Sequence, residues 1–160
     1  MRGDPITRRK TRSLSKQHLR LWLQMLRATG HVETAVRERL RDTFGTTLPR
    51  FDVMAALFRA PDGLTMTKLS RELKVSNGNV TGIVDRLVKD RLVVRTPNAQ
   101  DRRATHVALT KGGHEKFAEI AAIHEEWIDE LLGSFDDRDS ATLIELLARA
   151  VPREASKHGG

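Results

Sequence analysis

The chain of 160 residues contains no cysteine and no tyrosine, and aromatic residues make up only 4% of it. Without cysteine it has no disulfide, no thiolate metal site and no thiol redox sensor, a composition that fits the reducing cytoplasm. No apolar run approaches the ~18 residues that a membrane-spanning helix needs. The charged N-terminal segment is followed by no apolar stretch, so we do not expect a secretory signal peptide there.

Patterns typical of catalytic sites are also missing. The sequence has no HExxH, GxSxG or phosphate-loop motif, and the pair Gly112 and Gly113 lacks the spacing of a phosphate loop. The six histidines show no close metal-ligand spacing, although a zinc site built from distant residues stays open. His18 and His124 lie on apolar helical stripes, where a core histidine is the more common interpretation. We therefore predict that the protein is not an enzyme and needs no cofactor.

Positive charge, by contrast, is abundant and unevenly distributed. The formal net charge is +7, of which residues 1–20 carry +6 and residues 65–103 carry +5, whereas residues 104–160 carry −5. A basic excess concentrated in one segment indicates a polyanionic partner such as nucleic acid. A solvated charged surface would have the same composition, so charge alone leaves both interpretations open.

The spacing of apolar residues predicts a mostly helical fold with one small β-hairpin. Residues 1–12 have almost no apolar side chains, and we expect them to form a mobile basic arm. A helical pattern follows from Ser13 to Phe44, and Gly30 lies within it as a possible bend. The later elements expected are a helix opening at Leu48-Pro49, short helices capped by Thr65 or Thr67 and by Ser76, a hairpin from residues 92–95 and 104–109, a long helix after Thr110 and a last helix around residues 143–147.

The segment Ser76 to Asp90 is our candidate for a helix that enters the major groove of DNA. With Val80, Val84 and Leu87 turned inward, its outer face carries two glycines four residues apart. Glycine costs about 1 kcal/mol relative to alanine inside a helix, so the pair indicates close approach to base edges, with short polar side chains as readers. The alternative is an exposed helix with a frayed first turn. The residues expected to contact DNA here are Thr67, Ser76, Asn77, Gly78, Asn79, Thr81, Gly82, Arg86 and Arg95, and Ser70 is expected to contact the DNA backbone.

The order helix, helix, turn, helix, hairpin is the order of a winged helix-turn-helix. Residues 101–110, DRRATHVALT, resemble the wing signature of the MarR family of transcriptional regulators. Residues 66–76, MTKLSRELKVS, and residues 80–87, VTGIVDRL, are similar to the helix-turn-helix of that family. The resemblance extends over residues 14–150.

This resemblance implies how the chain is organised. Residues 13–160 would form a single domain of mainly α structure with a small β-hairpin wing (α+β). Its winged helix-turn-helix would span residues 48–110, and the dimerisation helices would span residues 13–47 and 111–150.

For the wing, the resemblance implies that Asp101 pairs with Arg103 and that Arg102 or Arg103 enters the minor groove. Narrow A·T-rich grooves attract arginine electrostatically, so this role is physically sensible. Without the family, the same residues would make an exposed hairpin with a surface ion pair worth only ~0–1 kcal/mol.

The terminal helices carry more apolar surface than a small winged helix covers by itself. Symmetric pairing of these helices would bury it, and a two-fold dimer would read two half-sites of a pseudo-palindrome. A monomeric helical bundle is the alternative. The residues of the last two helices in this surface are Trp127, Ile128, Leu131, Leu132, Leu143 and Leu147.

The family resemblance also implies a small-molecule effector in the crevice where the first, second and fifth helices meet. The helix-turn-helix is similar to the branch that responds to hydroxycinnamic and other aromatic acids or their CoA thioesters. The basic arm could serve such a thioester, track the DNA backbone or remain a solvated tail. Candidate lining residues, each of which could equally be an ordinary core side chain, are Trp22, Met25, Leu26, His31, Phe51, Met54 and Phe58, with Arg37 or Arg50 to hold a carboxylate.

The sequence thus predicts a homodimeric, cytoplasmic repressor that binds specific DNA and is released by a small molecule. Two alternatives stay open: a ligand-independent architectural DNA-binding protein, and a winged helix that contacts a protein partner. Salt-dependent binding that prefers a palindrome would separate the two DNA-binding candidates from the protein-interaction module. Release by a small molecule would separate the repressor from the architectural protein.

Overall fold

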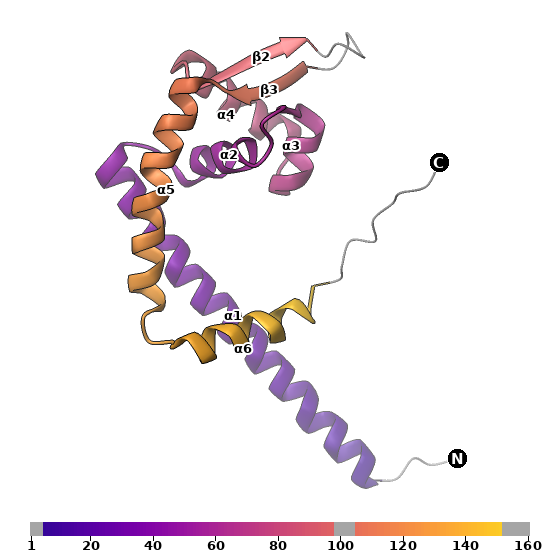
Figure 1. The fold of residues 1–160 in the computed structure, drawn as a ribbon. Coiled ribbons are helices and arrows are strands. Elements are labelled where there is room, and N and C mark those ends of the chain that lie inside the picture. Colours follow the sequence, from indigo (N-terminus) through magenta and orange to yellow (C-terminus); the bar gives the residue numbers. More distant parts are fainter. Residues whose placement is uncertain (1–4, 98–104, 152–160) are drawn as a thin grey trace.

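The computed structural model describes residues 5–97 and 105–151, with side chains from residue 14 onward. The elements are α1 (Pro5–Phe44), α2 (Leu48–Phe58), β1 (Leu64–Thr65), α3 (Met66–Leu73), α4 (Asn77–Lys89), β2 (Val93–Pro97), β3 (Thr105–Leu109), α5 (Lys111–Leu132) and α6 (Asp137–Ala148). These helices and strands follow one another in the order of a winged helix-turn-helix, and Figure 1 shows α1 and α6 extending away from the compact part that holds α2, α3, α4 and the hairpin.

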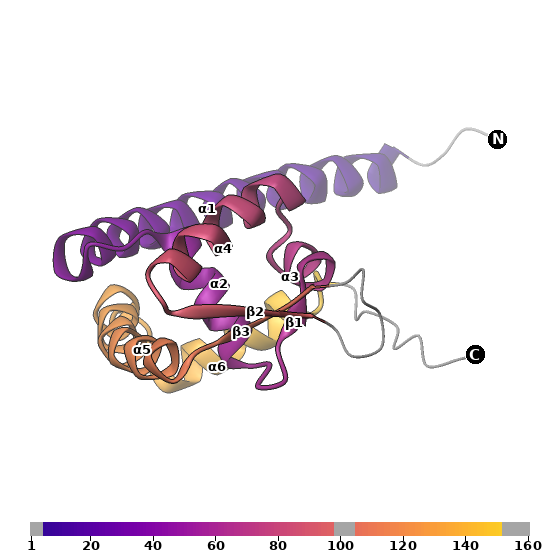
Figure 2. The same ribbon diagram turned by 90° about the horizontal axis from the view of Figure 1, so that it is seen from above.

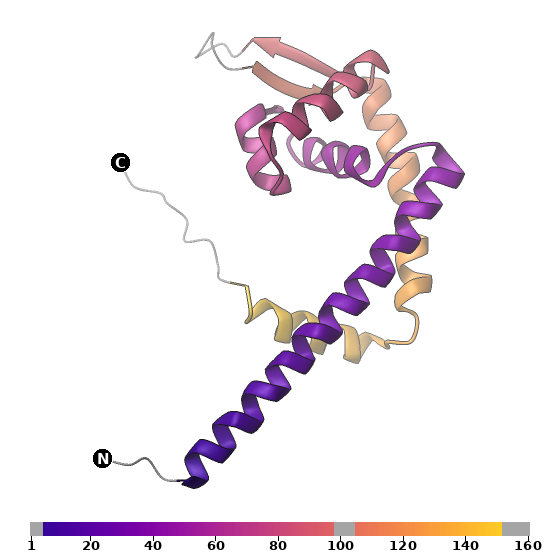
Figure 3. The same cartoon turned by 180° about the vertical axis from the view of Figure 1, so that it is seen from behind.

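Helix α1 is a single rod of 40 residues that passes through Gly30 without interruption (Figure 3). It starts at Pro5, whereas the sequence pattern predicted a start at Ser13, so most of the segment expected to be an arm is helical here. The helix ends where predicted, because Gly45 takes a φ of 60° that few other residues adopt easily. The amide of Gly45 donates a hydrogen bond to the carbonyl of Arg41 at 3.0 Å.

The middle of the chain forms the predicted helix-turn-helix and hairpin. The N-caps are local: Thr65 caps α3, Ser76 caps α4 and Thr110 caps α5, each through a side-chain oxygen that accepts a backbone N–H. Strand β3 lies between β1 and β2 in a three-stranded antiparallel sheet. The two-residue strand β1 was not predicted, because it is too short to show an alternating pattern. The predicted fold class is confirmed.

One core joins α2, α4 and the sheet to the C-terminal half of α1 and the first half of α5. Figure 2 shows α4 on one side of strands β2 and β3, and α5 at the end of these strands where β3 leads into it. The fully buried large side chains are Leu40, Val53, Met54, Leu57, Leu69, Val80, Val84, Leu87 and Val107.

The N-terminal half of α1 and all of α6 lie outside this core. Figure 1 shows α1 extending well beyond the other helices, and no residue of α6 is buried. None of the described helices is both long and apolar enough to cross a bilayer. Large apolar side chains exposed on these two helices are Leu14, Leu19, Leu21, Trp22, Leu23, Leu26, Leu143, Ile144, Leu146 and Leu147.

Candidate nucleic-acid interface

The turn between α3 and α4 sets the angle at which α4 leaves the core. Lys74 ends α3 in the left-handed region, with a φ of 54°. The hydroxyl of Ser70 donates to the carbonyl of Val75 at 2.6 Å, and the Val75 amide donates back to the Ser70 carbonyl at 3.2 Å. Ser70 is only 8% exposed. The expectation that Ser70 contacts the DNA backbone is therefore wrong, because its hydroxyl is used to hold this turn.

Helix α4 presents its polar face to solvent, as the sequence pattern predicted. Val80, Val84 and Leu87 are fully buried against the core. On the outer face, a Cβ added to Gly78 or Gly82 would meet nothing within 4 Å among the described residues. Packing within this part of the chain therefore gives no reason for either glycine. Also exposed on this helix are Asn77, Asn79, Thr81, Asp85, Arg86 and Lys89.

Some polar groups at the start of α4 already form hydrogen bonds within the chain. Ser76 acts as the N-cap, accepting from the amide of Asn79 at 3.4 Å. The hydroxyl of Thr81 donates to the carbonyl of Asn77 at 2.8 Å. Each hydroxyl oxygen keeps a lone pair, and the amide side chains of Asn77 and Asn79 are exposed.

The basic residues on this face differ in their freedom to meet a phosphate. Within the part of the chain that the structure describes, neither Arg86 nor Lys89 has a carboxylate within ion-pair distance. Arg95 on β2, in contrast, pairs with Asp85 of α4, its Nη1 lying 2.6 Å from Oδ1. Arg95 thus joins the base of the wing to α4 in this structure.

The wing hairpin is registered from Val93 opposite Leu109 to Pro97 opposite Thr105. Thr67 on α3 is exposed, as a contact to DNA requires. Asp101, Arg102 and Arg103, the residues expected at the wing tip, lie outside the described residues.

The structure scatters the residues that the sequence suggested for an effector. Phe51 and Met54 are buried in the core, whereas Phe58 is exposed and its ring lies tilted against that of Phe117, with ring centroids 4.8 Å apart. Each of the two candidate arginines pairs with an acid of the chain, Arg37 with Glu33 and Arg50 with Asp90. Those that are exposed or half-buried along α1 are Trp22, Met25, Leu26 and His31.

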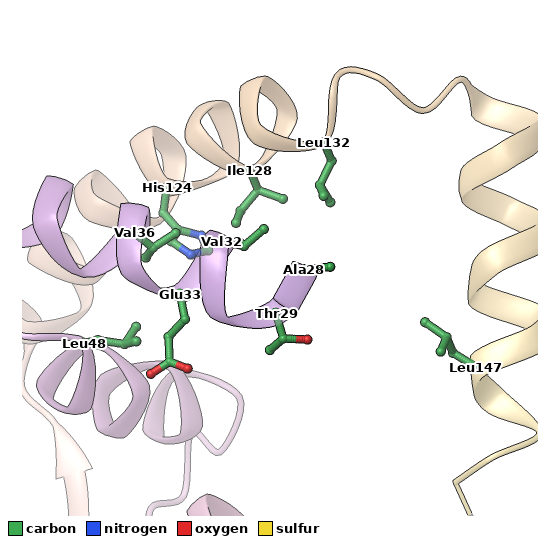
Figure 4. A pocket seen from close by; sticks show the side chains of 10 residues that line it. All are labelled: Ala28, Thr29, Val32, Glu33, Val36, Leu48, His124, Ile128, Leu132 and Leu147. Atoms are coloured by element: carbon green, nitrogen blue, oxygen red, sulfur yellow. The ribbon is translucent and has the colours of Figure 1, made fainter. Parts of the chain in front are cut away.

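A groove of about 480 Å³ nevertheless lies near the expected crevice, bounded by different residues (Figure 4). His124 of α5 lies on its wall, with its ring tilted against that of Phe51 and the ring centroids 4.7 Å apart. Partial burial lowers the pKa of His124. The predicted core role of His124 agrees with this position, whereas His18 is exposed. The groove is lined by Ala28, Thr29, Val32, Glu33, Val36, Leu48, His124, Ile128, Leu132 and Leu147. The spacing of apolar residues in the sequence predicted that several of these residues lie on helices, but it did not predict that they line a groove.

Groups of three or more side chains able to hold a metal ion do not occur among the described residues. The helix-turn-helix, the exposed polar face of α4 and the hairpin that follows it together define a winged-helix protein of the kind that reads DNA grooves.

Comparison with known proteins places the chain within this class. The sequence model of the MarR family matches residues 44–104. The chain resembles the crystal structure of a MarR family transcriptional regulator from Silicibacter pomeroyi with 38% identity and a TM-score of 0.72, covering 85% of this chain and 94% of that one. The chain belongs to the MarR family, as the sequence motifs implied.

Two further relatives indicate what such proteins do. A cysteine-to-serine mutant of Escherichia coli MarR, solved in complex with operator DNA, is 27% identical with a TM-score of 0.73, over 85% of this chain and 96% of that one. The transcriptional activatory protein BadR of Rhodopseudomonas palustris is 31% identical over 67% of this chain, and the match spans 63% of the length of BadR. Because these relatives are regulators, the prediction that the chain is not an enzyme is confirmed.

Proposed function

We propose that the protein is a cytoplasmic transcription regulator, most simply a repressor, that binds a pseudo-palindromic operator as a homodimer. The observation that carries this proposal is the outer face of α4. It combines two glycines with open space around them, exposed short polar side chains, and the exposed basic side chains of Arg86 and Lys89. These features suit a helix that lies deep in the major groove with cations at its end over the phosphates.

The apolar side chains outside the core support a dimer. Ile144 is 70% exposed on α6 and Trp22 is 53% exposed on α1. Apolar patches of this extent on a soluble chain usually mark an interface. A second copy that covered α1 and α6 would also place two α4 helices on one side of the assembly for two half-sites.

Trp127 contributes less to this interface than the sequence suggested, because it packs inside the chain. Its ring centroid lies 6.0 Å from that of Phe44, and the Arg39 guanidinium lies 5.9 Å from the ring centroid. Ile144 is therefore the better position at which to test the dimer.

We also propose that a small aromatic molecule in the groove between α1 and α5 releases the protein from DNA. The groove is within the volume range of ~300–1000 Å³ typical of ligand sites, and it lies beside α5. Helix α5 is joined directly to the wing through Thr110, so an occupant that shifts α5 would shift the DNA-reading elements. The sequence resemblance suggests an aromatic acid or its CoA thioester as this molecule.

DNA binding is tested by selecting duplexes from a random library and measuring affinity for the preferred sequence against scrambled DNA over a range of salt. We expect a two-fold symmetric preference and an affinity that falls steeply with salt. Arg86→Ala and Arg103→Ala should each weaken specific binding by ~1–3 kcal/mol. Arg138→Ala on α6, far from α4, is the matched control. Equal affinity for all sequences would favour an architectural protein, and no affinity for DNA would favour a protein-interaction module.

Dimerisation is tested by sedimentation equilibrium, in which the chain of 18.0 kDa should show about twice that mass. Ile144→Glu should shift the equilibrium toward the monomer, because it would bury a charge in an apolar seam. Thr142→Glu, on the polar side of the same helix, should leave the dimer intact. A wild-type monomer at micromolar concentration would remove the dimer from the proposal.

A further inference from the structure

Two arginines line a groove of about 510 Å³ between the start of α2 and one flank of α4. Arg50 belongs to the first turn of α2, and Arg86 belongs to α4. Arg50 forms an ion pair with Asp90, the residue that ends α4. Two guanidinium groups thus lie in one groove, and among the described residues only that of Arg50 has a carboxylate partner.

Asp90 is also within reach of Arg86, because the two residues are one helical turn apart. The amide of Asp90 donates to the carbonyl of Arg86 at 3.0 Å. Side chains four residues apart on a helix have Cβ atoms about 5–6 Å from each other, and opposite charges at this spacing attract. The carboxylate of Asp90 is bound to Arg50 instead. Arg50 therefore holds the acidic side chain that is the nearest alternative partner of Arg86 along α4.

Stability alone is a poor explanation for the pair between Arg50 and Asp90. The side chain of Asp90 is 46% exposed, so solvent screens the attraction between the two charges. The Nε of Arg50 is buried and has no hydrogen-bond partner within the described ranges. A buried donor without a partner is destabilising, which offsets part of what the ion pair contributes. The place at which the pair holds the Asp90 carboxylate is the better explanation.

We infer that Arg50 is a positioning residue for DNA binding: it holds the Asp90 carboxylate away from Arg86, which leaves the Arg86 guanidinium for an operator phosphate. This inference rests on the DNA binding proposed above. Arg86 is exposed on α4, whereas the side chain of Arg50 is only 21% exposed. Without Arg50, the Asp90 carboxylate turns to Arg86 and neutralises it. A phosphate contact is then lost although the residue that makes it is unchanged.

The experiment measures the affinity of the full-length protein for its preferred duplex over a range of salt, by fluorescence anisotropy. Arg50→Met should flatten the slope of log K against log salt by ~0.9, the value for one phosphate contact, and should weaken binding roughly tenfold at 0.1 M salt. Arg50→Met/Asp90→Asn should restore the slope and the affinity, because asparagine cannot neutralise Arg86. Arg50→Lys keeps a cation beside Asp90 and should remain near the wild type.

The matched control removes an arginine from an ion pair at the other side of the molecule. Arg39 pairs with Glu130 between α1 and α5, and neither residue lines the groove beside α4. Arg39→Met should keep the wild-type salt slope. A loss of slope in this control equal to that in Arg50→Met would overturn the inference, because any lost arginine would then have the same effect.

A second set of variants shows whether the effect of Arg50 passes through Arg86. Arg86→Gln should flatten the salt slope by ~0.9 in the wild-type background and again in Arg50→Met/Asp90→Asn. In the Arg50→Met background it should change the slope little, because Asp90 already neutralises Arg86 there. Equal losses in all three backgrounds would overturn the inference, since independent effects add whereas coupled residues do not. Arg50 would then contact DNA itself or only support the fold.

The exchange of partners is also measured without DNA, from the NMR signals of the arginine Nε–Hε groups in the free protein. The signal of Arg86 is identified by its loss in Arg86→Gln. In Arg50→Met this signal should shift, and it should return when Asp90→Asn is added. An unshifted Arg86 signal overturns the inference even where the wild type binds its operator. A wild type that does not bind DNA refutes the proposed function, and the NMR signals still report whether Arg50 controls the partner of Asp90.

Urea denaturation establishes that each variant is folded before its DNA affinity is interpreted. If Arg50→Met is unfolded, Arg50→Gln takes its place, since it keeps a polar side chain in the groove but no charge, and the same result is expected. A wild-type salt slope in either folded variant would overturn the inference. So would a flattened slope that Asp90→Asn does not restore.

Discussion

Gly113 at the start of α5 lies directly against the backbone carbonyl of Leu92, at the start of the wing. A Cβ on Gly113 would lie 2.0 Å from that carbonyl oxygen and 2.9 Å from its carbon. The same oxygen accepts the amide of Thr110 at 3.0 Å, and the Thr110 hydroxyl donates to the carbonyl of Arg91 at 2.8 Å. The first turn of α5 is thus locked to the end of α4 and the base of the wing. We expect α5 and the DNA-reading elements to move as one body.

Gly113→Ala should therefore be destabilising, because backbone atoms on both sides must separate to admit one methyl group. Overpacking of this kind costs about 1–3 kcal/mol. The free energy of unfolding is measured by urea denaturation. Gly112→Ala is the matched control, since its Cβ would meet only the Thr110 hydroxyl at 3.9 Å. The control should be neutral or more stable by up to ~1 kcal/mol, and equal effects of the two substitutions would contradict the close contact.

The two open glycines of α4 should separate stability from DNA binding. Gly78→Ala and Gly82→Ala meet no atom within 4 Å in the described part of the free chain. Each should raise the free energy of unfolding by ~0.5–1 kcal/mol while weakening operator binding, if the helix backbone approaches the base edges closely. Thermal unfolding and fluorescence anisotropy with labelled operator measure the two quantities. Tighter or unchanged operator binding by both variants would show that the glycines serve no close approach.

The ion pair between Asp85 and Arg95 should hold the wing in register with α4 and keep a carboxylate on the DNA-facing side neutralised. Asp85→Asn releases Arg95 and removes a negative charge that repels phosphate. Affinity for scrambled DNA should then rise, with a log K against log salt slope steeper by ~0.9 for each added phosphate contact. The ratio of operator to scrambled affinity should fall.

A matched control for this change is available on the other side of the molecule. Arg39 pairs with Glu130 between α1 and α5 at 2.6 Å, the same separation as in the wing pair. Glu130→Gln should leave both DNA affinities and the salt slope unchanged. If Asp85→Asn behaves like this control, the pair has no part in positioning the wing.

Asp52 should make the protein less stable at neutral pH than in mild acid. Burial and Glu33 raise the pKa of Asp52 in the folded state, so the folded chain holds this proton more tightly than the unfolded chain. The stability that this adds is present below the unfolded pKa of ~3.9 and is lost as pH rises through the folded pKa. Asp52→Asn should raise the melting temperature near pH 7 and lose that advantage near pH 4.

The prediction is checked by measuring the melting temperatures of the wild type and of Asp52→Asn at several pH values. Asp129→Asn, which removes an exposed carboxylate of α5, is the control and should not reproduce the pH-dependent gain. A neutral-pH melting temperature for Asp52→Asn at or below that of the wild type would contradict the direction of the pKa shift.

Much of the fold could be predicted because its signals are local. The inward stripe of α4 follows from residues three and four apart on a helix. The caps Ser76 and Thr110 each act on an amide three residues later, so a short stretch of sequence contains the whole interaction. The wing and helix-turn-helix motifs are equally local, and they led to the correct family.

Tertiary contacts decided the rest. Gly112 and Gly113 look alike in the sequence. The carbonyl of Leu92, which the hairpin brings against Gly113, leaves no room for a Cβ at Gly113, whereas Gly112 has room for one. Ser70 was expected to face DNA, but the chain turns back at Val75 and uses the hydroxyl internally. Arg95 likewise meets a carboxylate on another element.

The same distinction separates the predicted effector residues from the observed groove. The sequence by itself determined that α1 and α5 each carry an apolar stripe, because periodicity depends only on neighbours along the helix. The tertiary structure decided which apolar side chains enter the core, as Met54 does, and which line a groove, as Val32 and Ile128 do. That choice depends on how helices far apart in the sequence cross, and no local pattern contains the crossing.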